Sequence, residues 1–267
     1  MGKISIIAVL GPTGVGKTKL GVGLAKALNG EVISVDSLQV YRHGGLMTAK
    51  PTPEEMDDIT HHLIDYLQPD QEPVNFIDVA ISRIQKIYDD GKIPLLVGGS
   101  ISLTKPLLAH PFLQQSNLSV ILLHSKLSDL KPRLDTRIEE MVEQGLFQEM
   151  LSLYDLEQKI LGRPDYSKGV WKSIGYRELR PAIDVHNKDC SDSNWLKGII
   201  EMKKRTVSYA QEQMNYIWCE IVPVLQKRDL NFALFVVKKA STFEEQVIQP
   251  AVSECFEWLY KDLERSL

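Results

Sequence analysis

Short apolar runs alternate along this chain with stretches whose apolar residues recur at helical spacing. Ile4–Leu10 is a continuous apolar run rich in Ile and Val, which is typical of a strand buried on both faces. The further runs predicted as strands are Glu31–Val35, Ile93–Val97 and Val120–Leu123. Between them, Lys17–Leu28 and Phe76–Tyr88 have the periodicity of amphipathic helices. Strands that alternate with helices predict an α/β fold with a mostly parallel sheet flanked by helices.

The second half of the chain is more charged, and its pattern is mainly helical. The predicted helices are Ser128–Leu156, Lys168–Ile183, Trp195–Met214 and Phe243–Leu263. Gly162–Ser167 is predicted as a loop, and Ile217–Val222 and Phe232–Val237 as late strands. We expect one catalytic domain over residues 1–267, in which the helical subregion 126–205 forms a lid or wall.

Composition places the chain among ordinary globular proteins and makes some classes unlikely. Of its 267 residues, 43% are hydrophobic and 25% charged, with a net charge of -4 and a pI of about 5.9. An acidic balance gives no general attraction to nucleic acid. The three cysteines, Cys190, Cys219 and Cys255, lack CxxC spacing, and the apolar N-terminal run is too short to cross a membrane. We therefore predict a cytoplasmic protein without a membrane partner.

The first strand leads into GPTGVGKT, at Gly11–Thr18, which satisfies the pattern G-x-x-x-x-G-K-[ST] between a strand and a helix. Gly11, Gly14 and Gly16 let backbone N–H groups converge on phosphate oxygens, and the helix N-terminus adds partial positive charge. Lys17 supplies a full charge, and the Thr18 hydroxyl can ligate Mg²⁺. The alternative is a glycine-rich turn without a ligand. The motif alone fits kinases, NTPases and other transferases equally well.

A carboxylate follows the second strand. Asp36 ends the run VISVD, at the carboxyl edge where α/β sheets build their sites. Sequential strands are usually neighbours, so we expect Asp36 to lie near the phosphate loop. There it can accept a proton from a nucleophile. The alternative is a helix-capping or loop acid with a structural role.

Several segments together resemble the isopentenyltransferases, the tRNA and adenylate dimethylallyltransferases that prenylate adenine N6. The matching runs, in the family's order, are GPTGVGKT (11–18), DSLQVYR (36–42), TAKP (48–51), HHLID (61–65), GKIPLLVGGS (91–100), RIEEMVEQGLFQE (137–149) and SIGYREL (173–179). The resemblance implies that dimethylallyl diphosphate is the donor and Mg²⁺ the cofactor. It also implies that the phosphate loop holds the donor's diphosphate while Asp36 takes a proton from the amine.

The resemblance carries over to individual positions. It places Ser100 beside the reacting groups with Asp36, Lys17 and Thr18, and it adds Thr13 and Arg137 to the glycines that contact the diphosphate. Ser37 and Gln39 match positions that line the same site. For the phosphates of a nucleotide, the candidate cations are Lys50, Lys105, Lys172 and Arg177. Solvated surface charge is the simpler interpretation of each of these four, and of Arg133, which shares a helix face with Arg137.

Departures from the family pattern bear on the acceptor. The helical insertion with which the tRNA enzymes embrace RNA would follow Leu108, where only Ala109–Asn117 intervenes. Ser100 and Ser102 in GGSISL also resemble the small-nucleotide enzymes. We therefore predict cytokinin biosynthesis through a free acceptor, AMP, ADP or ATP, with tRNA an unlikely partner.

Two alternatives stay open. The first is a tRNA dimethylallyltransferase with a reduced grip on RNA, which TAKP favours. The second is a nucleotide-binding module without catalysis, for which the only support is Val207 and Glu212 in place of family arginines. Adjacent His61 and His62 could indicate a metal site, although histidines that hold the backbone are the simpler interpretation.

Overall fold

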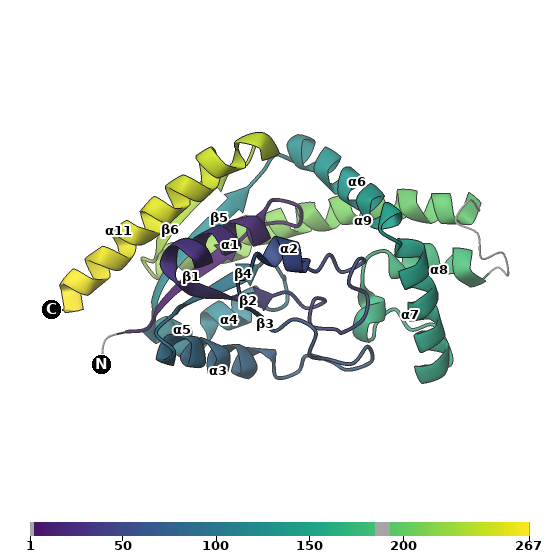
Figure 1. The fold of residues 1–267 in the computed structure, drawn as a ribbon, viewed down its shortest axis with the longest axis horizontal. Coiled ribbons are helices and arrows are strands. Elements are labelled where there is room, and N and C mark those ends of the chain that lie inside the picture. Colours follow the sequence, from purple (N-terminus) through teal and green to yellow (C-terminus); the bar gives the residue numbers. More distant parts are fainter. Residues whose placement is uncertain (1–2, 185–192, 267) are drawn as a thin grey trace.

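The computed structural model describes residues 3–184 and 193–266 (Figure 1). Its centre is one six-stranded sheet in which every pair of neighbouring strands is parallel. The strands are β1 (Ser5–Leu10), β2 (Gly30–Val35), β3 (His61–His62), β4 (Ile93–Gly98), β5 (Asn117–His124) and β6 (Asn231–Val236). Their order across the sheet is β3-β2-β4-β1-β5-β6. The predicted α/β class with a parallel sheet is confirmed.

Alternate residues of β1 pack into two hydrophobic clusters, one on each face of the sheet. Ile7 and Val9 pack in the cluster that contains the buried face of α1 (Lys17–Leu28) and residues from the start of α11 (Gln249–Ser266). Ile6 and Ala8 pack in the other cluster, with α3 (Phe76–Asp89) and the short helices α4, α5 and α10. The bounds of those three are Thr104–Ala109, Pro111–Gln115 and Val222–Lys227. A strand covered on both faces needs the continuous apolar run that the sequence showed.

Beyond one end of the sheet, the chain continues as a group of helices on the right in Figure 1. They are α6 (Leu127–Glu143), α7 (Leu146–Ile160), α8 (Tyr176–Asp184) and α9 (Ser193–Tyr216). Gly145, with φ of 104°, makes the left-handed turn between α6 and α7. The long helix α9 runs from this group back to the sheet. These helices correspond to the predicted subregion 126–205, whose role as a lid or wall stays a prediction.

Three predicted elements differ in the structure. Ser128–Leu156 is not one helix, because the left-handed turn at Gly145 divides it into α6 and α7. Ile217–Val222 is not a strand, because α9 continues through a π-helical turn (Ile217–Ile221) into α10. Its apolar residues Ile217, Ile221 and Leu225 are buried at a spacing of four, which fits a helix face. Lys168–Ile183 is not one helix but a 3₁₀ turn (Gly169–Lys172) followed by α8. Gly175, with φ of 107°, interrupts it.

Short elements near the loops were not predicted from the sequence. They include α2 (Pro53–Met56), the two-residue strand β3, and the helices α4 and α5. A 3₁₀ turn (Ala240–Thr242) and a π-helical turn (Glu244–Ile248) precede α11. Cys190 lies outside the described residues. None of the helices within residues 3–184 and 193–266 combines the length and the apolar character that a bilayer crossing needs.

Candidate active site

The phosphate-loop motif forms the turn from β1 into α1, at the carboxyl edge of the sheet. Gly14 and Gly16 adopt φ of 75° and 103°, a region that favours glycine. A Cβ at Gly14 would lie 2.5 Å from Leu134 of α6, and a Cβ at Gly16 would lie 2.7 Å from the Phe243 ring. Both glycines are therefore required by backbone conformation and by packing. The loop is held between α6 and the segment that precedes α11.

Lys17 lies half-buried at the start of α1, and its Nζ donates a hydrogen bond of 2.7 Å to the carbonyl oxygen of Pro12. Burial lowers its pKa to about 8. The Asp36 carboxylate opposes this shift, and the Arg137 guanidinium adds to it. The three charged groups are therefore within electrostatic reach of one another. Lys17 and Arg137 thus place two cationic groups beside the loop, which suits an anionic ligand.

The lowered pKa of Lys17 predicts that pyrophosphate binding weakens as the pH rises above about 8. Below that pH the Lys17 ammonium is charged and attracts the anion. Above it, Lys17 is neutral in most of the free protein, and it must take up a proton before it can attract pyrophosphate. The dissociation constant should then rise by up to about tenfold per pH unit. Titration calorimetry at several pH values would measure this. Lys17→Arg stays charged at every pH used, so its pH profile shows the effect of the ionisation of pyrophosphate itself. Equal pH profiles of the dissociation constant for the two proteins would contradict the prediction.

Asp36 lies at the end of β2, but the reason given for its position was wrong. β4 lies between β1 and β2, so the two strands are not neighbours. Asp36 nevertheless approaches Lys17, because all three strands are parallel and end at the same edge. Its Oδ1 accepts hydrogen bonds from the backbone N–H groups of Leu38, at 2.8 Å, and Gln39, at 3.3 Å. Among the described residues, only Oδ1 is engaged in this way.

Gln39 and Arg137 meet on the carbonyl oxygen of Ala49. Each donates to it over 3.1 Å, and Gln39 Oε1 accepts a 2.8 Å bond from Ser34. Ala49 has φ of 52°, an uncommon conformation for a residue with a Cβ. The two side chains predicted to contact ligands therefore also fix the loop across from the phosphate loop. Burial lowers the pKa of Arg137, against the opposing effects of Glu55 and Asp36.

Glu149 of α7 supports the same loop from the other side. Its two carboxylate oxygens accept hydrogen bonds from the backbone N–H groups of Leu46, at 2.9 Å, and Met47, at 2.8 Å. The Thr48 hydroxyl donates to the Gly44 carbonyl over 2.6 Å. The segment 44–50 is thus held by α7, α6 and the loop after β2 together, although it contains no long regular element.

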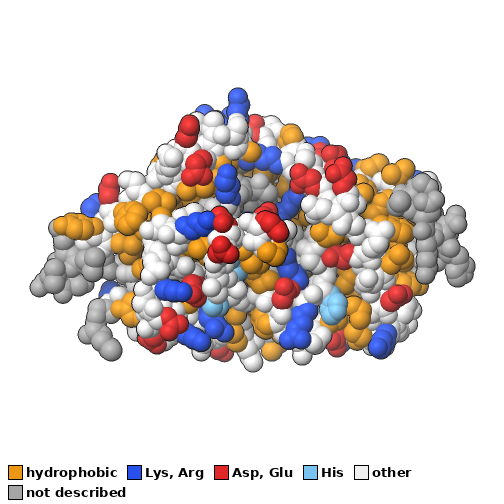
Figure 2. Space-filling model, in the orientation of Figure 1, with side chains coloured by type: hydrophobic (Ala, Val, Ile, Leu, Met, Phe, Trp, Pro, Cys, Tyr) orange, Lys and Arg blue, Asp and Glu red, His pale blue; other side chains and the backbone are white. Residues whose placement is uncertain are grey.

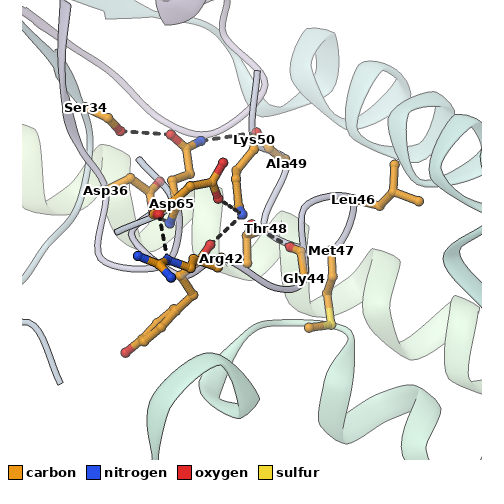
Figure 3. Close-up of polar contacts among 12 residues, drawn as sticks. Ser34, Asp36, Arg42, Gly44, Leu46, Met47, Thr48, Ala49, Lys50 and Asp65 are labelled. Carbon is orange, nitrogen blue, oxygen red and sulfur yellow. Dashed lines mark hydrogen bonds and ion pairs between the residues drawn. The ribbon is translucent and has the colours of Figure 1, made fainter. Parts of the chain in front are cut away.

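Lys50, a candidate cation for the nucleotide, is engaged inside the loop that contains Ala49. Only 9% of its side chain is exposed, and its ammonium pairs with Asp65 and donates to the Tyr41 carbonyl oxygen (Figure 3). Its charge is matched inside the loop, which makes it a support for that loop rather than a free cation for a nucleotide. Lys105 and Lys172 are likewise paired, with Glu220 and Glu72. Of the four candidate cations, only Arg177 is not paired with a carboxylate among the described residues; it lies over the Tyr166 ring.

The end of β4 approaches the phosphate loop closely. A Cβ at Gly99 would lie 2.2 Å from the Gly11 carbonyl oxygen. Next to it, Ser100 is buried and its hydroxyl lies 3.2 Å from that of Ser102. The structure therefore brings Ser100 to the strand edge that carries the phosphate loop and Asp36.

Gln213 of α9 joins the phosphate loop to the end of β4. Its Oε1 accepts a 2.8 Å hydrogen bond from the Thr13 N–H, and its Nε2 donates a 2.8 Å bond to the Gly99 carbonyl oxygen. Tyr209, one turn earlier, lies near Asp36: burial, then the charges of Asp36 and Glu212, raise its pKa. The sequence predicted neither as a site residue. Their spacing of four on one helix was an available signal.

We expect Gln213→Leu to destabilise the protein and weaken pyrophosphate binding. The substitution leaves two polar groups without their partners, each at a cost of about 1–3 kcal/mol. Urea denaturation and calorimetry would measure the two effects. Gln211→Leu is the matched control, since that side chain bonds the exposed side chain of Asn215. Equal losses of stability in the two variants would contradict the bridging role.

The remaining candidates from the sequence are His61, His62 and Arg133. His61 hydrogen-bonds the Ile59 carbonyl oxygen over 2.9 Å, and His62 lies 2.6 Å from Glu31, as expected of histidines that hold local structure. In the described part of the chain, no group of three or more His, Cys, Asp or Glu side chains could hold a metal ion. Arg133, one turn before Arg137, has a buried Nη2 without a hydrogen-bond partner among the described residues.

Comparisons with known proteins identify relatives of one family. The sequence model of the IPP transferase family matches residues 39–115 and 103–219. A "Bifunctional cytokinin biosynthesis protein" of Fusarium pseudograminearum is 43% identical over 258 residues, which cover 96% of this chain and 53% of that protein. A tRNA dimethylallyltransferase of Staphylococcus aureus, strain bovine RF122 / ET3-1, is 36% identical over 64% of this chain and 54% of its own length. The chain thus spans about half the length of these relatives.

Two solved structures are similar in fold. One is a eukaryotic dimethylallyltransferase acting on tRNA, with a TM-score of 0.82 at 23% identity, over 97% of this chain and 80% of that one. The other is the full-length tRNA isopentenylpyrophosphate transferase of Bacillus halodurans, with a TM-score of 0.75 at 26% identity and 99% of both chains covered. At such identities, the first comparison bears on the fold alone.

Proposed function

Because this chain belongs to the IPP transferase family, we propose that it transfers a dimethylallyl group from dimethylallyl diphosphate to the N6 amine of a free adenine nucleotide. The observation that carries the proposal is the meeting of Lys17, Arg137 and Asp36 beside the phosphate loop. Two cations suit a diphosphate leaving group, and a carboxylate next to them suits removal of a proton from an amine. The name of the Fusarium relative supports a role in cytokinin biosynthesis.

The proposed reaction is one displacement at C1 of the donor. The lone pair of N6 forms the new N–C bond while the C1–O bond breaks and its electrons pass to the diphosphate. Asp36 accepts the proton that N6 loses, through the carboxylate oxygen that is outside its own turn. Lys17, Arg137 and the loop N–H groups stabilise the charge that develops on the pyrophosphate. Ser100 is proposed to orient the reacting groups, and Ser37, beside Asp36, is a proposed contact of the nucleotide.

Mg²⁺ is the proposed cofactor. A dedicated carboxylate cage is not needed, because Mg²⁺ commonly keeps several waters and takes its other ligands from substrate phosphates. The chain's own ligand would be the hydroxyl of Thr18, in the first turn of α1 after Gly16 and Lys17. When bound, the ion would neutralise charge on the leaving diphosphate.

Thr18→Ala should make turnover much less responsive to added Mg²⁺, because the side-chain ligand is lost. Thr18→Ser keeps a hydroxyl and should retain most of the response. A titration of rate against Mg²⁺ concentration for the three proteins would measure this. Identical titration curves would place the metal on other residues.

A free nucleotide is the proposed acceptor because the described part of the chain has only a short connection where the tRNA enzymes carry their RNA-embracing insertion. The connection Ala109–Asn117 folds into the short helix α5. Arg228 fixes it by donating to the carbonyl oxygens of Leu108, at 2.9 Å, and Leu113, at 3.0 Å. Figure 2 shows acidic and basic side chains mixed over the viewed face, without one extended basic area. An RNA-binding surface normally presents such an area.

Transfer to tRNA is the second candidate, favoured by the identity with the Staphylococcus enzyme. A competition experiment separates the two. With labelled dimethylallyl diphosphate, AMP, ADP or ATP should take the label, while unmodified tRNA at equal adenine concentration should not. Preferential labelling of tRNA would overturn the proposal. Absence of transfer to every acceptor would favour a nucleotide-binding module without catalysis.

A further inference from the structure

Helices α8 and α9 form the walls of a surface groove of about 570 Å³. This volume is in the range of small-molecule sites. Four of its lining side chains are cationic, namely Arg177, Lys197, Lys204 and Arg205, whereas two are acidic, Glu178 and Glu201. A net positive groove is notable in a chain whose formal charge is -4. The groove therefore differs in charge from the molecule as a whole.

Much of this positive charge is not neutralised internally. Lys204 pairs with Glu201 over 2.7 Å, and Glu178 accepts a 2.8 Å bond from the Gly175 N–H. Arg177, Lys197 and Arg205 are exposed and form no ion pair with another described residue. Arg177 lies 4.9 Å from the centre of the Tyr166 ring, which orients its guanidinium without removing its charge. Three cations are thus available to a ligand in the groove.

One helix connects the groove to the candidate active site. Gln213 holds α9 against the phosphate loop. Tyr209, one turn earlier, lies near Asp36, whose charge adds to the effect of burial in raising the pKa of the Tyr209 hydroxyl. Arg205 is one further turn away and lines the groove. Residues four apart are neighbours on a helix surface, and the eight residues from Gln213 to Arg205 rise about 12 Å. The groove therefore begins about two helical turns from the phosphate loop.

We propose that the α8–α9 groove binds the phosphate chain of the nucleotide acceptor, with Arg177, Lys197 and Arg205 as the contacting cations. This deepens the proposed function and rests on it. With adenine N6 at Asp36, the sugar and phosphates extend along α9 past Tyr209. Longer phosphate chains reach more of the cations, so ADP and ATP are better acceptors than AMP.

A short phosphate chain fits the groove better than the backbone of RNA does. The acidic residues Glu178 and Glu201 interrupt the basic side chains along it. A polynucleotide needs a longer uninterrupted positive track, because several phosphates must be neutralised together. A di- or triphosphate needs only the few cations at one end.

The test compares three acceptors in wild type, three groove variants and one control variant. For wild type, Arg177→Gln, Lys197→Gln and Arg205→Gln, kcat/KM is measured with AMP, ADP and ATP at saturating donor. Wild type should prefer ATP and ADP, and Arg205→Gln should reduce kcat/KM for ATP by roughly tenfold while changing that for AMP much less. Lys86→Gln on α3, an exposed position outside the groove, removes the same charge and should change none of the three values.

The outcomes separate the groove from the function itself. If the groove variants prenylate all three nucleotides as wild type does, or if all three values fall equally, the groove assignment is wrong while nucleotide prenylation stands. If wild type prenylates tRNA and none of the nucleotides in the competition experiment described above, the proposed function fails and the groove assignment with it. A selective loss with ADP and ATP supports both.

Discussion

Asp36→Asn is expected to reduce turnover by about 10²–10⁴-fold with little change in nucleotide binding. The substitution is well matched to the structure. The amide oxygen of Asn can still accept from the backbone N–H groups of Leu38 and Gln39, as Oδ1 does now. The loop after β2 therefore keeps its shape while the proton acceptor is lost. Single-turnover kinetics with labelled donor would measure the chemical step apart from substrate binding and product release.

Two further proteins make this experiment decisive. Asp36→Ala removes both the base and the anchor of the turn, so it should also lower stability in urea. Asp65→Asn removes a carboxylate that pairs with Lys50 in the neighbouring loop and should leave most of the chemical rate. If Asp36→Asn weakened nucleotide binding and left the chemical rate intact, Asp36 would be a binding residue and another base would be required.

Lys17→Ala should lower turnover by on the order of 10²–10³-fold, the usual effect of removing one preorganised electrostatic donor. Lys17 is the one full charge within the phosphate loop, and it is half-buried, where its interaction with an anion is stronger than in water. The donor's affinity should fall as well, because the diphosphate is charged before and after the transfer. Steady-state kinetics and pyrophosphate binding would measure the two losses.

Lys19→Ala is the matched control for Lys17. It removes the same charge two residues later in α1, from an exposed side chain, and should have little effect on rate. Retention of more than about half the activity by Lys17→Ala would contradict the role of the phosphate loop. Equal losses in both variants would indicate a general effect of charge rather than a specific contact.

Local features of the site could be predicted from the sequence because each depends on a short segment. The phosphate loop is defined by glycine positions between a strand and a helix, and the structure uses Gly14 and Gly16 as that motif requires. The strands were recognisable because burial on both faces demands continuous apolar runs. Asp36 could be placed at a strand end because it is the first polar residue after the apolar run of that strand. In each case, the residues next to one another in the sequence are enough to predict the feature.

The tertiary structure alone decided which of these segments meet. Insertion of β4 between β1 and β2 depends on long-range strand pairing, for which no local pattern exists. Gln213 contacts Thr13 across 200 positions, and Lys50 became a loop support because folding brought Asp65 to it. The groove exists only because α8 and α9 pack side by side. Local propensity fixes the elements and the chemistry they carry, whereas partners distant in sequence are chosen by packing and charge matching in the folded chain.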